Sequence, residues 1–226
     1  MNRLLVVTAI LVASLAWMAG QVHSLPSADA SLPPGIQEPE RTRRLLFREL
    51  QPVRLSNCTF ERFGEEADGG YLMCGNLLRY SQVAYSYGIN GYDGWGCGMA
   101  ARLASTTHQY DCFNLEEPAC AAGRTQFHPL CVAGRASVDG EGRAFEPLTE
   151  QIARNGDAFR RLVVKMDVEG AEWETLLRTP DEVLRRFDQL TIEMHGVDRP
   201  VHVAVVRKLK RTFHVAHLVT EPGKVG

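Results

Sequence analysis

The fold is decided by residues Leu162 to Leu177, LVVKMDVEGAEWETLL, where a hydrophobic run ends abruptly and a helical spacing of apolar residues begins. Leu162 to Val168 is apolar, rich in β-branched residues and too short for an independent helix, so it predicts a buried strand of a parallel sheet. Gly170 ends this strand. From Ala171 onward the apolar residues recur at helical spacing, with acidic residues in the first turn. The stretch therefore predicts a strand-turn-helix unit of an α/β fold.

Acidic side chains follow this strand at its carboxyl end. Strand alternation places Asp167 and Glu169 on the same side as Lys165. In open α/β sheets ligands bind beyond the carboxyl ends of the strands, so the two carboxylates are candidate catalytic residues. The alternative is that they only cap the next helix or pair with a nearby lysine.

A second unit of this kind lies earlier in the chain. Gln82 to Ile89 predicts a strand, and a glycine-rich loop and the helix Met99 to Ser105 follow it. Such a loop can bring a nucleotide close to backbone amides at the start of a helix. The glycines from Gly88 to Gly98 do not form GxGxxG, which disfavours a dinucleotide enzyme, and glycines of this kind also occur in ordinary loops.

Two further segments continue the predicted sheet. His108 to Asn114 predicts a strand that ends near Asp111, about 20 residues after the first loop, where nucleotide-binding folds place an acid on the ribose hydroxyls. The alternative for this aspartate is a turn-forming or capping role. Phe127 to Ala133 predicts a third strand. The turn-rich stretch Ser137 to Phe145 then crosses the ligand edge of the sheet, with Asp139 as a candidate contact on the adenine side.

A fifth strand is predicted at Leu190 to His195. If it neighbours the strand Leu162 to Val168, as successive α/β units usually do, then Asp167, Glu169, Glu193 and His195 meet at one edge of the sheet. These groups could deprotonate a hydroxyl or hold a divalent metal ion. For His195 the alternative is a core histidine whose ring is satisfied by its neighbours.

The remaining segments complete this plan. Pro200 to Lys210 predicts a helix and Thr212 to Val219 a sixth strand. Near the other end of the chain, Asn57 to Asn76 predicts a hairpin around the turn Asp68-Gly69-Gly70.

Composition narrows the class of protein. With 25 basic and 27 acidic residues the formal charge is −2, so no global field favours nucleic acid. A chain of 226 residues suits one domain with a full core and a tail.

The amino-terminal segment predicts entry into the secretory pathway. Leu4 to Gly20 is apolar and follows Arg3, which indicates a signal peptide cleaved after Ser24 or an uncleaved single-pass anchor with the rest of the chain in the lumen. A buried core helix is the alternative. We expect residues 1–24 to be this signal or anchor, residues 25–50 a linker or stem with an amphipathic lead-in helix from Arg41 to Leu50, and residues 51–226 the main domain.

Cysteine usage agrees with an oxidising compartment. All six cysteines lie in the predicted luminal part, which indicates disulfides. If the chain were cytosolic, we would instead expect free buried cysteines. No CxxC pair is present, so an ordinary zinc ribbon is disfavoured. Cys58 and Cys74 bracket the predicted hairpin and could staple it. Asn57-Cys58-Thr59 is an N-glycosylation sequon, whose use a disulfide at Cys58 would oppose.

Four separated segments, DGGY, YSYGINGYDGW, KMDVEGAEWETLL and IEMHG, resemble in order the FkbM-like family of S-adenosylmethionine-dependent methyltransferases and its secretory-pathway methyltransferase-like relatives. The resemblance covers about Asn57 to Val219, and KMDVEGAEWETLL is its most specific part. It implies a Rossmann-like class I methyltransferase sheet with helices on both faces. Such a sheet normally closes with a further antiparallel strand. Too few residues follow Val219 for it, so we expect that strand to be missing.

The resemblance also implies an activity, which is O-methylation of a hydroxyl on a small molecule or glycan in the secretory lumen, by a Golgi-type anchored or a secreted protein. S-adenosylmethionine would be the cofactor, held by Gly88, Asn90, Asp93, Asp111 and Asp139. The candidate catalytic residues for this activity are Asp167, His195 and Glu169, because of their predicted positions at the strand ends. A divalent metal ion at Asp167, Glu193 and His195 stays an open alternative.

Two rival functions belong to other classes. The first is a luminal binding protein that keeps the methyltransferase fold without catalysis, which the expected loss of a strand favours. The second is a nicotinamide oxidoreductase, which the absence of GxGxxG opposes. Binding of S-adenosylmethionine or of NAD would separate them.

Overall fold

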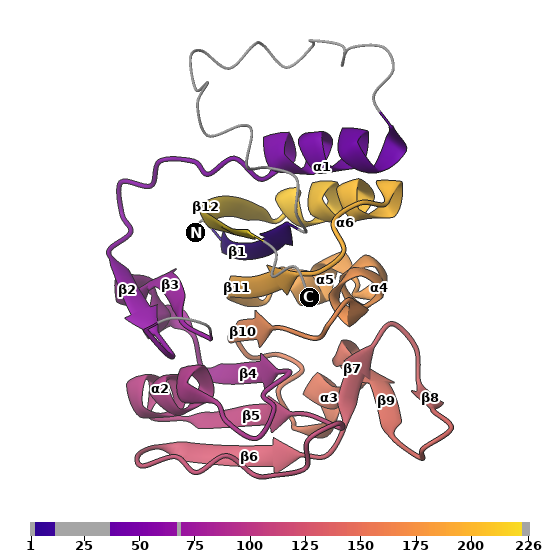
Figure 1. Ribbon diagram of the computed structural model, residues 1–226. Coiled ribbons are helices and arrows are strands. Elements are labelled where there is room, and N and C mark those ends of the chain that lie inside the picture. Colours follow the sequence, from indigo (N-terminus) through magenta and orange to yellow (C-terminus); the bar gives the residue numbers. More distant parts are fainter. Residues whose placement is uncertain (1–2, 12–36, 67–68, 223–226) are drawn as a thin grey trace.

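The computed structural model describes residues 3–11, 37–66 and 69–222. Its centre is a seven-stranded sheet with the order β12-β1-β11-β10-β4-β5-β6, in which every neighbouring pair is parallel (Figure 1). The strands of this sheet are β1 Arg3–Leu11, β4 Val83–Tyr87, β5 Thr106–Tyr110, β6 Arg124–His128, β10 Leu162–Met166, β11 Phe187–Met194 and β12 Phe213–Pro222. Because all strands run the same way, their carboxyl ends share one edge.

The central strands are buried on both faces. Every residue of β4, β10 and β11 is buried, which is why these segments are near-continuous apolar runs. Tyr85 and Val164 belong to the large core on one face, and Ala84 and Val163 to a smaller core on the other. This alternation confirms that Lys165 and Asp167 point away from the larger core.

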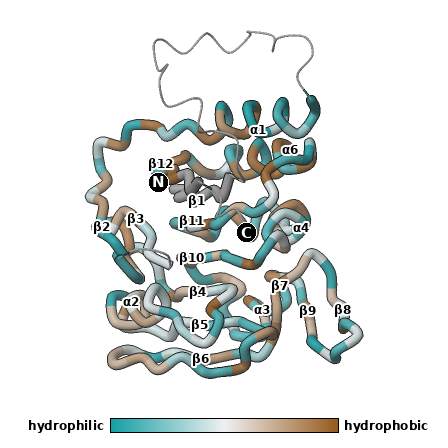
Figure 2. The backbone as a smooth tube through the Cα atoms, in the orientation of Figure 1, coloured by the Kyte–Doolittle hydropathy of each residue, from teal (hydrophilic) through white to brown (hydrophobic). Residues whose placement is uncertain are grey.

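Helices cover both faces, as expected. The helices are α1 Glu38–Glu49, α2 Gly94–Leu103, α3 Leu148–Arg154, α4 Ala171–Arg178, α5 Asp181–Leu184 and α6 Pro200–Lys210. All but α2 contribute to, or pack around, the larger core, whereas α2 and the hairpin of β2 (Phe60–Phe63) and β3 (Tyr71–Cys74) cover the opposite face. The predicted lead-in helix is α1, whose turns carry hydrophilic and hydrophobic residues together (Figure 2).

The amino-terminal segment contributes a strand to the sheet. Arg3–Leu11, which the sequence predicts to be part of a signal peptide or anchor, forms β1 between β11 and β12. The predicted cleavage site at Ser24 and residues 25–36 of the predicted linker lie outside the described residues. Among the helices of the described part, none is long and apolar enough to span a membrane. The division of the chain into signal, stem and domain stays a prediction.

The predicted third strand is wrong in one respect, because it is two strands. β6 ends at His128, and β7 (Cys131–Ala133) begins after a tight turn in which the Leu130 N–H donates to the His128 carbonyl. β7 leaves the main sheet and pairs with β9 (Ala144–Pro147), which also pairs with β8 (Ser137–Val138). This small sheet lies beyond the carboxyl ends of the main strands (Figure 1).

Three disulfides join the cysteines: Cys58–Cys74, Cys97–Cys120 and Cys112–Cys131. The first confirms the predicted staple across the hairpin of β2 and β3, whose turn residue Asp68 lies outside the described residues. Disulfides persist in oxidising compartments, so these three indicate the secretory pathway.

Candidate active site

A cavity of about 800 Å³ opens at the carboxyl edge of the main sheet, a size typical of small-molecule sites. Its walls come from the ends of β4, β5, β10 and β11 and from the small sheet. Among the predicted site residues, the cavity is lined by Gly88, Asn90, Asp111, Asp167, Glu169 and Glu193. The cavity thus lies at the edge of the sheet where the sequence predicts a ligand to bind.

The loop after β4 approaches the end of β10 very closely. Gly88 has φ +73°, and a Cβ there would overlap the carbonyl oxygen of Asp167, so this position requires glycine. Lys165, which is buried, donates from Nζ to the Gly88 carbonyl at 2.7 Å. Asn90 and Glu169 also have positive φ, although neither is glycine. Non-glycine residues with left-handed backbone often occur at functional sites, and both of these residues line the cavity.

Asp111 lines the cavity, but its carboxylate holds the surrounding loops. One oxygen accepts the N–H groups of Ile89 and Asn90, at 3.0 and 2.8 Å, and the other accepts those of Phe113 and Asn114, at 2.8 and 3.1 Å. A carboxylate has about four acceptor positions, so these four backbone donors occupy them all. The side chain fixes the loops after β4 and β5 to each other. This is the turn-forming role that the sequence analysis gave as the alternative for Asp111.

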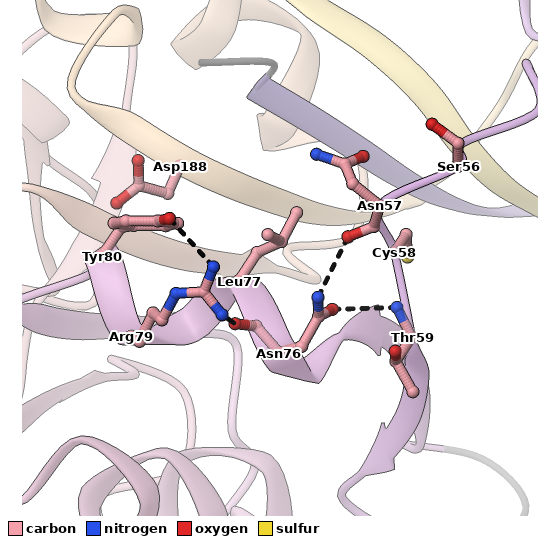
Figure 3. Close-up of a pocket in the computed structure, with 9 residues that line it drawn as sticks. All are labelled: Ser56, Asn57, Cys58, Thr59, Asn76, Leu77, Arg79, Tyr80 and Asp188. Carbon is pink, nitrogen blue, oxygen red and sulfur yellow. Dashed lines mark hydrogen bonds between the residues drawn. The ribbon is translucent and has the colours of Figure 1, made fainter.

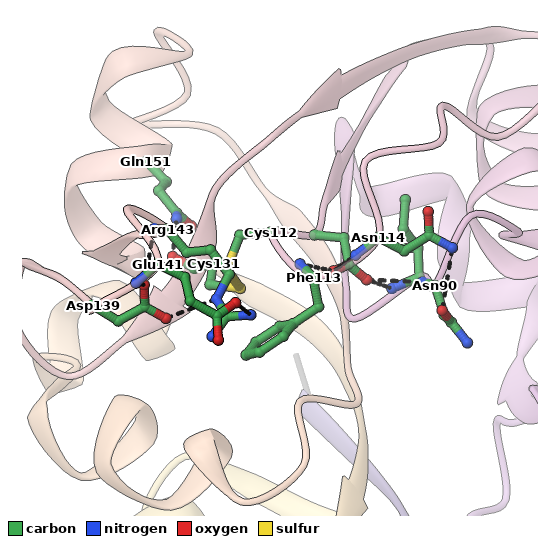
Figure 4. The surroundings of a disulfide bond; sticks show 11 residues. Asn90, Cys112, Phe113, Asn114, Cys131, Asp139, Glu141, Arg143 and Gln151 are labelled. Atoms are coloured by element: carbon green, nitrogen blue, oxygen red, sulfur yellow. Dashed lines mark hydrogen bonds and ion pairs between the residues drawn. A yellow bond between two sulfur atoms is a disulfide. The ribbon is translucent and has the colours of Figure 1, made fainter.

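Asp93 and Asp139 do not line the cavity. Asp93 caps α2 by accepting the Gly96 N–H at 2.7 Å, and its other oxygen accepts from Gln109. Asp139 closes the turn between β8 and β9, where it accepts from the backbone and the guanidinium of Arg143 (Figure 4). Both carboxylates stabilise local structure, so their roles with a cofactor stay predictions.

The predicted catalytic residues meet at the ends of β10 and β11, which are neighbours as expected. His195 Nε2 lies 3.7 Å from Asp167 Oδ1, 3.6 Å from Glu169 Oε2 and 3.7 Å from Glu193 Oε1. These separations are ion-pair distances longer than hydrogen bonds, so His195 Nε2 lies among three carboxylates. Glu193 is buried, whereas Glu169 reaches the rim of the cavity.

Glu172 also belongs to this cluster, although the sequence analysis did not single it out. Its side chain is 0 % exposed. Oε1 accepts the His195 N–H at 2.8 Å and lies 3.3 Å from the ring nitrogen Nδ1, while Oε2 accepts the Gly170 N–H at 2.8 Å. The available signal was its position four residues before Leu176 on the apolar face of α4.

The charge state of His195 follows from these neighbours. Burial by itself would lower its pKa. The hydrogen bond and negative charge of Glu172, with the charges of Glu169 and Asp167, outweigh burial and raise the pKa of His195 to about 9. The ring therefore carries a proton at neutral pH and faces the cavity carboxylates as a cation.

The same cluster has the composition of a divalent metal site. Asp167, Glu193 and His195 each offer one ligand atom, and these atoms lie within 4.8 Å of one another. Carboxylate oxygen with imidazole nitrogen suits magnesium, manganese, iron or zinc. A cation there would replace the proton on His195, since a metal ligand must be deprotonated.

An aromatic rim borders the other side of the cavity. Phe113 is 67 % exposed, packs edge-on against Phe145 and carries the Arg143 guanidinium over its ring at 4.2 Å. The disulfide Cys112–Cys131 anchors this rim to the small sheet (Figure 4). An exposed aromatic ring beside a polar loop can stack on a planar base.

No protein-family model, curated protein or solved structure matches this chain. The class that the fold defines is a Rossmann-like α/β protein, a parallel sheet with helices packed on both faces. Membership of the FkbM-like family stays a prediction from the sequence.

Proposed function

We propose that this chain is an S-adenosylmethionine-dependent methyltransferase of the secretory pathway that methylates a hydroxyl oxygen of a small molecule or glycan. The observation that carries the proposal is that a glycine turn and the carboxylates of Asp167 and Glu193, with His195 beside them, meet at one cavity. All four segments that resemble the FkbM-like family contribute to its walls, through Gly69, Gly88, Asp167 and Glu193 among others. Segments far apart in the sequence thus line the same cavity.

The loops after β4 and β5 form the side of the cavity proposed for the cofactor. Bound S-adenosylmethionine would supply a methyl group already activated by its sulfonium. Gly88 and Asn90 would bind its methionine end through their backbone, and Phe113 would stack on the adenine. Asp111 acts indirectly, by holding these loops in place. The chain is then left to align an acceptor and take up its proton.

The acid–base roles follow from the charge on His195. Because the pKa of His195 is raised to about 9, its protonated ring is a poor base at neutral pH. Asp167 is therefore the group proposed to orient the acceptor hydroxyl and receive its proton. Glu193 would support it, Glu169 would contact the acceptor at the rim, and protonated His195 would hold these carboxylates together.

A divalent cation is a second way for the same cluster to act. When bound by Asp167, Glu193 and His195, the ion would make an acceptor hydroxyl more acidic. His195 would then be a neutral ligand, so metal binding should release a proton and weaken as the pH falls. Calorimetry with Mg²⁺, Mn²⁺ and Zn²⁺ in buffers of different ionisation enthalpy would measure that release.

The test begins with the disulfide-bonded full chain and with calorimetric titration of S-adenosylmethionine, its demethylated product and NAD. Transfer of a labelled methyl group to hydroxyl compounds and glycans is then measured for wild type, Asp167→Ala and His195→Ala. Glu150→Ala, an exposed change on α3, is the control. We expect both cavity variants to bind cofactor and lose transfer. Undiminished transfer would remove them from the mechanism, and tight binding of NAD alone would sink the proposal.

The occupied carboxylate of Asp111 favours one rival function. Because its acceptor positions are taken by backbone N–H groups, no acid is free there for ribose hydroxyls. A luminal binding protein that uses the cavity without catalysis would need no such acid. Cofactor binding without methyl transfer to any acceptor would be its signature in the same experiment.

A further inference from the structure

A second hollow lies at the opposite edge of the sheet, beside the sequon Asn57-Cys58-Thr59. It measures about 380 Å³ and is formed by the segment before β2, the 3-10 helix Gly75–Tyr80 and Asp188 near the start of β11. Asn57 and Thr59 are exposed, and the Asn57 side chain borders the hollow (Figure 3). The reactive amide therefore faces solvent and has space beside it.

We propose that Asn57 carries an N-linked glycan, attached before the disulfide Cys58–Cys74 closes. In the attachment step the Asn57 Nδ2 atom forms a bond to the anomeric carbon of a sugar on a lipid-linked diphosphate donor. The bond from that carbon to the diphosphate breaks, the diphosphate leaves, and the amide nitrogen loses one proton. The sequon supplies the acceptor asparagine and the required hydroxyl residue, and the disulfides indicate the compartment in which such donors act.

The order of events follows from how the folded chain holds the sequon. The Asn76 side chain donates to the Asn57 carbonyl at 3.0 Å and accepts the Thr59 N–H at 2.8 Å (Figure 3). The Gly75 N–H donates to the Thr59 carbonyl at 3.0 Å, and Cys58 is bonded to Cys74. A backbone held by three hydrogen bonds and a disulfide cannot adopt a new conformation in an enzyme cleft.

Cys74, the disulfide partner of Cys58, enters the lumen after the sequon. Cys74 lies 16 residues beyond Cys58, so the sequon enters the lumen before the disulfide can form. Until then Asn57 belongs to an open chain that a transferase can bind. The glycan is therefore attached first, and the sequon is then locked by Asn76 and the disulfide.

A glycan at this place leaves the proposed active site open. Asp188 and Glu193 belong to the same strand, β11, and five residues of extended chain separate them by about 17 Å. The sequon hollow is at the amino end of this strand and the larger cavity at its carboxyl end. The inference rests on the compartment and not on the proposed methyl transfer.

The experiment uses the full chain expressed in secretory cells and the change in mass on enzymatic removal of N-glycans. The sequence holds no other Asn-x-Ser/Thr triplet with x other than proline, so any shift reports on Asn57. We expect wild type and Thr59→Ser to lose the mass of one glycan, and Asn57→Gln and Thr59→Ala to show no shift. Gels of denatured protein give this result even for variants that fold poorly.

Two outcomes would overturn the inference. A wild-type protein with an intact Cys58–Cys74 disulfide and no mass shift would show that Asn57 is not modified. A glycan on Cys74→Ser but not on wild type would show that the disulfide closes first, which contradicts the proposed order. Cofactor binding by Asn57→Gln should equal that of wild type. The glycan and the methyltransferase proposals are therefore tested by separate measurements, and either can fail without the other.

Discussion

Replacing Glu172 with glutamine should change the charge on His195. Glu172 is fully buried and contacts both the backbone N–H and the ring of His195. Without its negative charge, the cost of burying the imidazolium is opposed by the weaker effects of Glu169 and Asp167 and by Glu193, whose Oε1 lies 3.7 Å from Nε2. An opposite charge in contact typically moves a pKa by about 1–3 units, so the pKa of His195 should fall by that amount.

The size of the effect on stability follows from linkage. A rise in the pKa of His195 from 6.5 to about 9 corresponds to about 3 kcal/mol, at about 1.4 kcal/mol per pKa unit. The His195 side chain is only 14 % exposed, so solvent screens this interaction little. The folded state has the raised pKa, so this contribution is complete below pH 6.5 and is lost as the pH rises from 6.5 to about 9. In Glu172→Gln most of this pH dependence should disappear.

Two measurements check this reasoning. Heteronuclear NMR of the imidazole, assigned with a His195→Gln variant, gives the pKa directly. Urea unfolding at several pH values between 6 and 10 gives the free energy of unfolding. Glu174→Gln, an exposed change on the same helix that removes only a surface pair with Arg178, is the matched control and should behave like wild type. A pKa that stays near 9 in Glu172→Gln would refute the argument.

Three further predictions concern single residues of the sheet and its loops. Burial lowers the pKa of His128 to about 4, so its contribution to stability is complete above pH 6.5 and is lost as the pH falls toward 4. His128→Phe should therefore flatten the acid side of urea-unfolding free energies, and an unchanged slope would contradict this. Asp111→Asn should cost about 1–3 kcal/mol in urea unfolding, because an amide NH₂ then faces backbone donors, and calorimetry should show weaker cofactor binding. Gly88→Ala should push the loop away from Asp167 and abolish binding, so unaltered melting and binding would remove the loop from the site.

The elements that sequence predicted well are those with a strong local signal. β10 and α4 follow from the change of apolar spacing around Gly170, and α6 has the predicted bounds Pro200–Lys210. The adjacency of β10 and β11 also follows from the connection rule for successive α/β units. These features depend on short-range patterns, which a sequence displays directly.

The sequence was less informative where a residue's partner lies far away in the chain. Phe127–Ala133 has one apolar pattern, but only pairing with β5 and β9 divides it into β6 and β7. Asp111 has the spacing of a ribose ligand, yet backbone N–H groups from two loops fill its acceptor positions. The spacing of residues along the chain does not show which donors will fill the hydrogen-bond acceptor positions of a carboxylate.

The sequence by itself determined the class of fold and placed Asp167 and Glu193 at the carboxyl edge of the sheet. Only the tertiary structure decided that Glu172 sets the charge on His195 and that Asp93 and Asp139 lie away from the cavity. The reason is physical: strand and helix periods arise from neighbouring residues. A charge state arises from whichever groups the packed chain brings within a few ångströms.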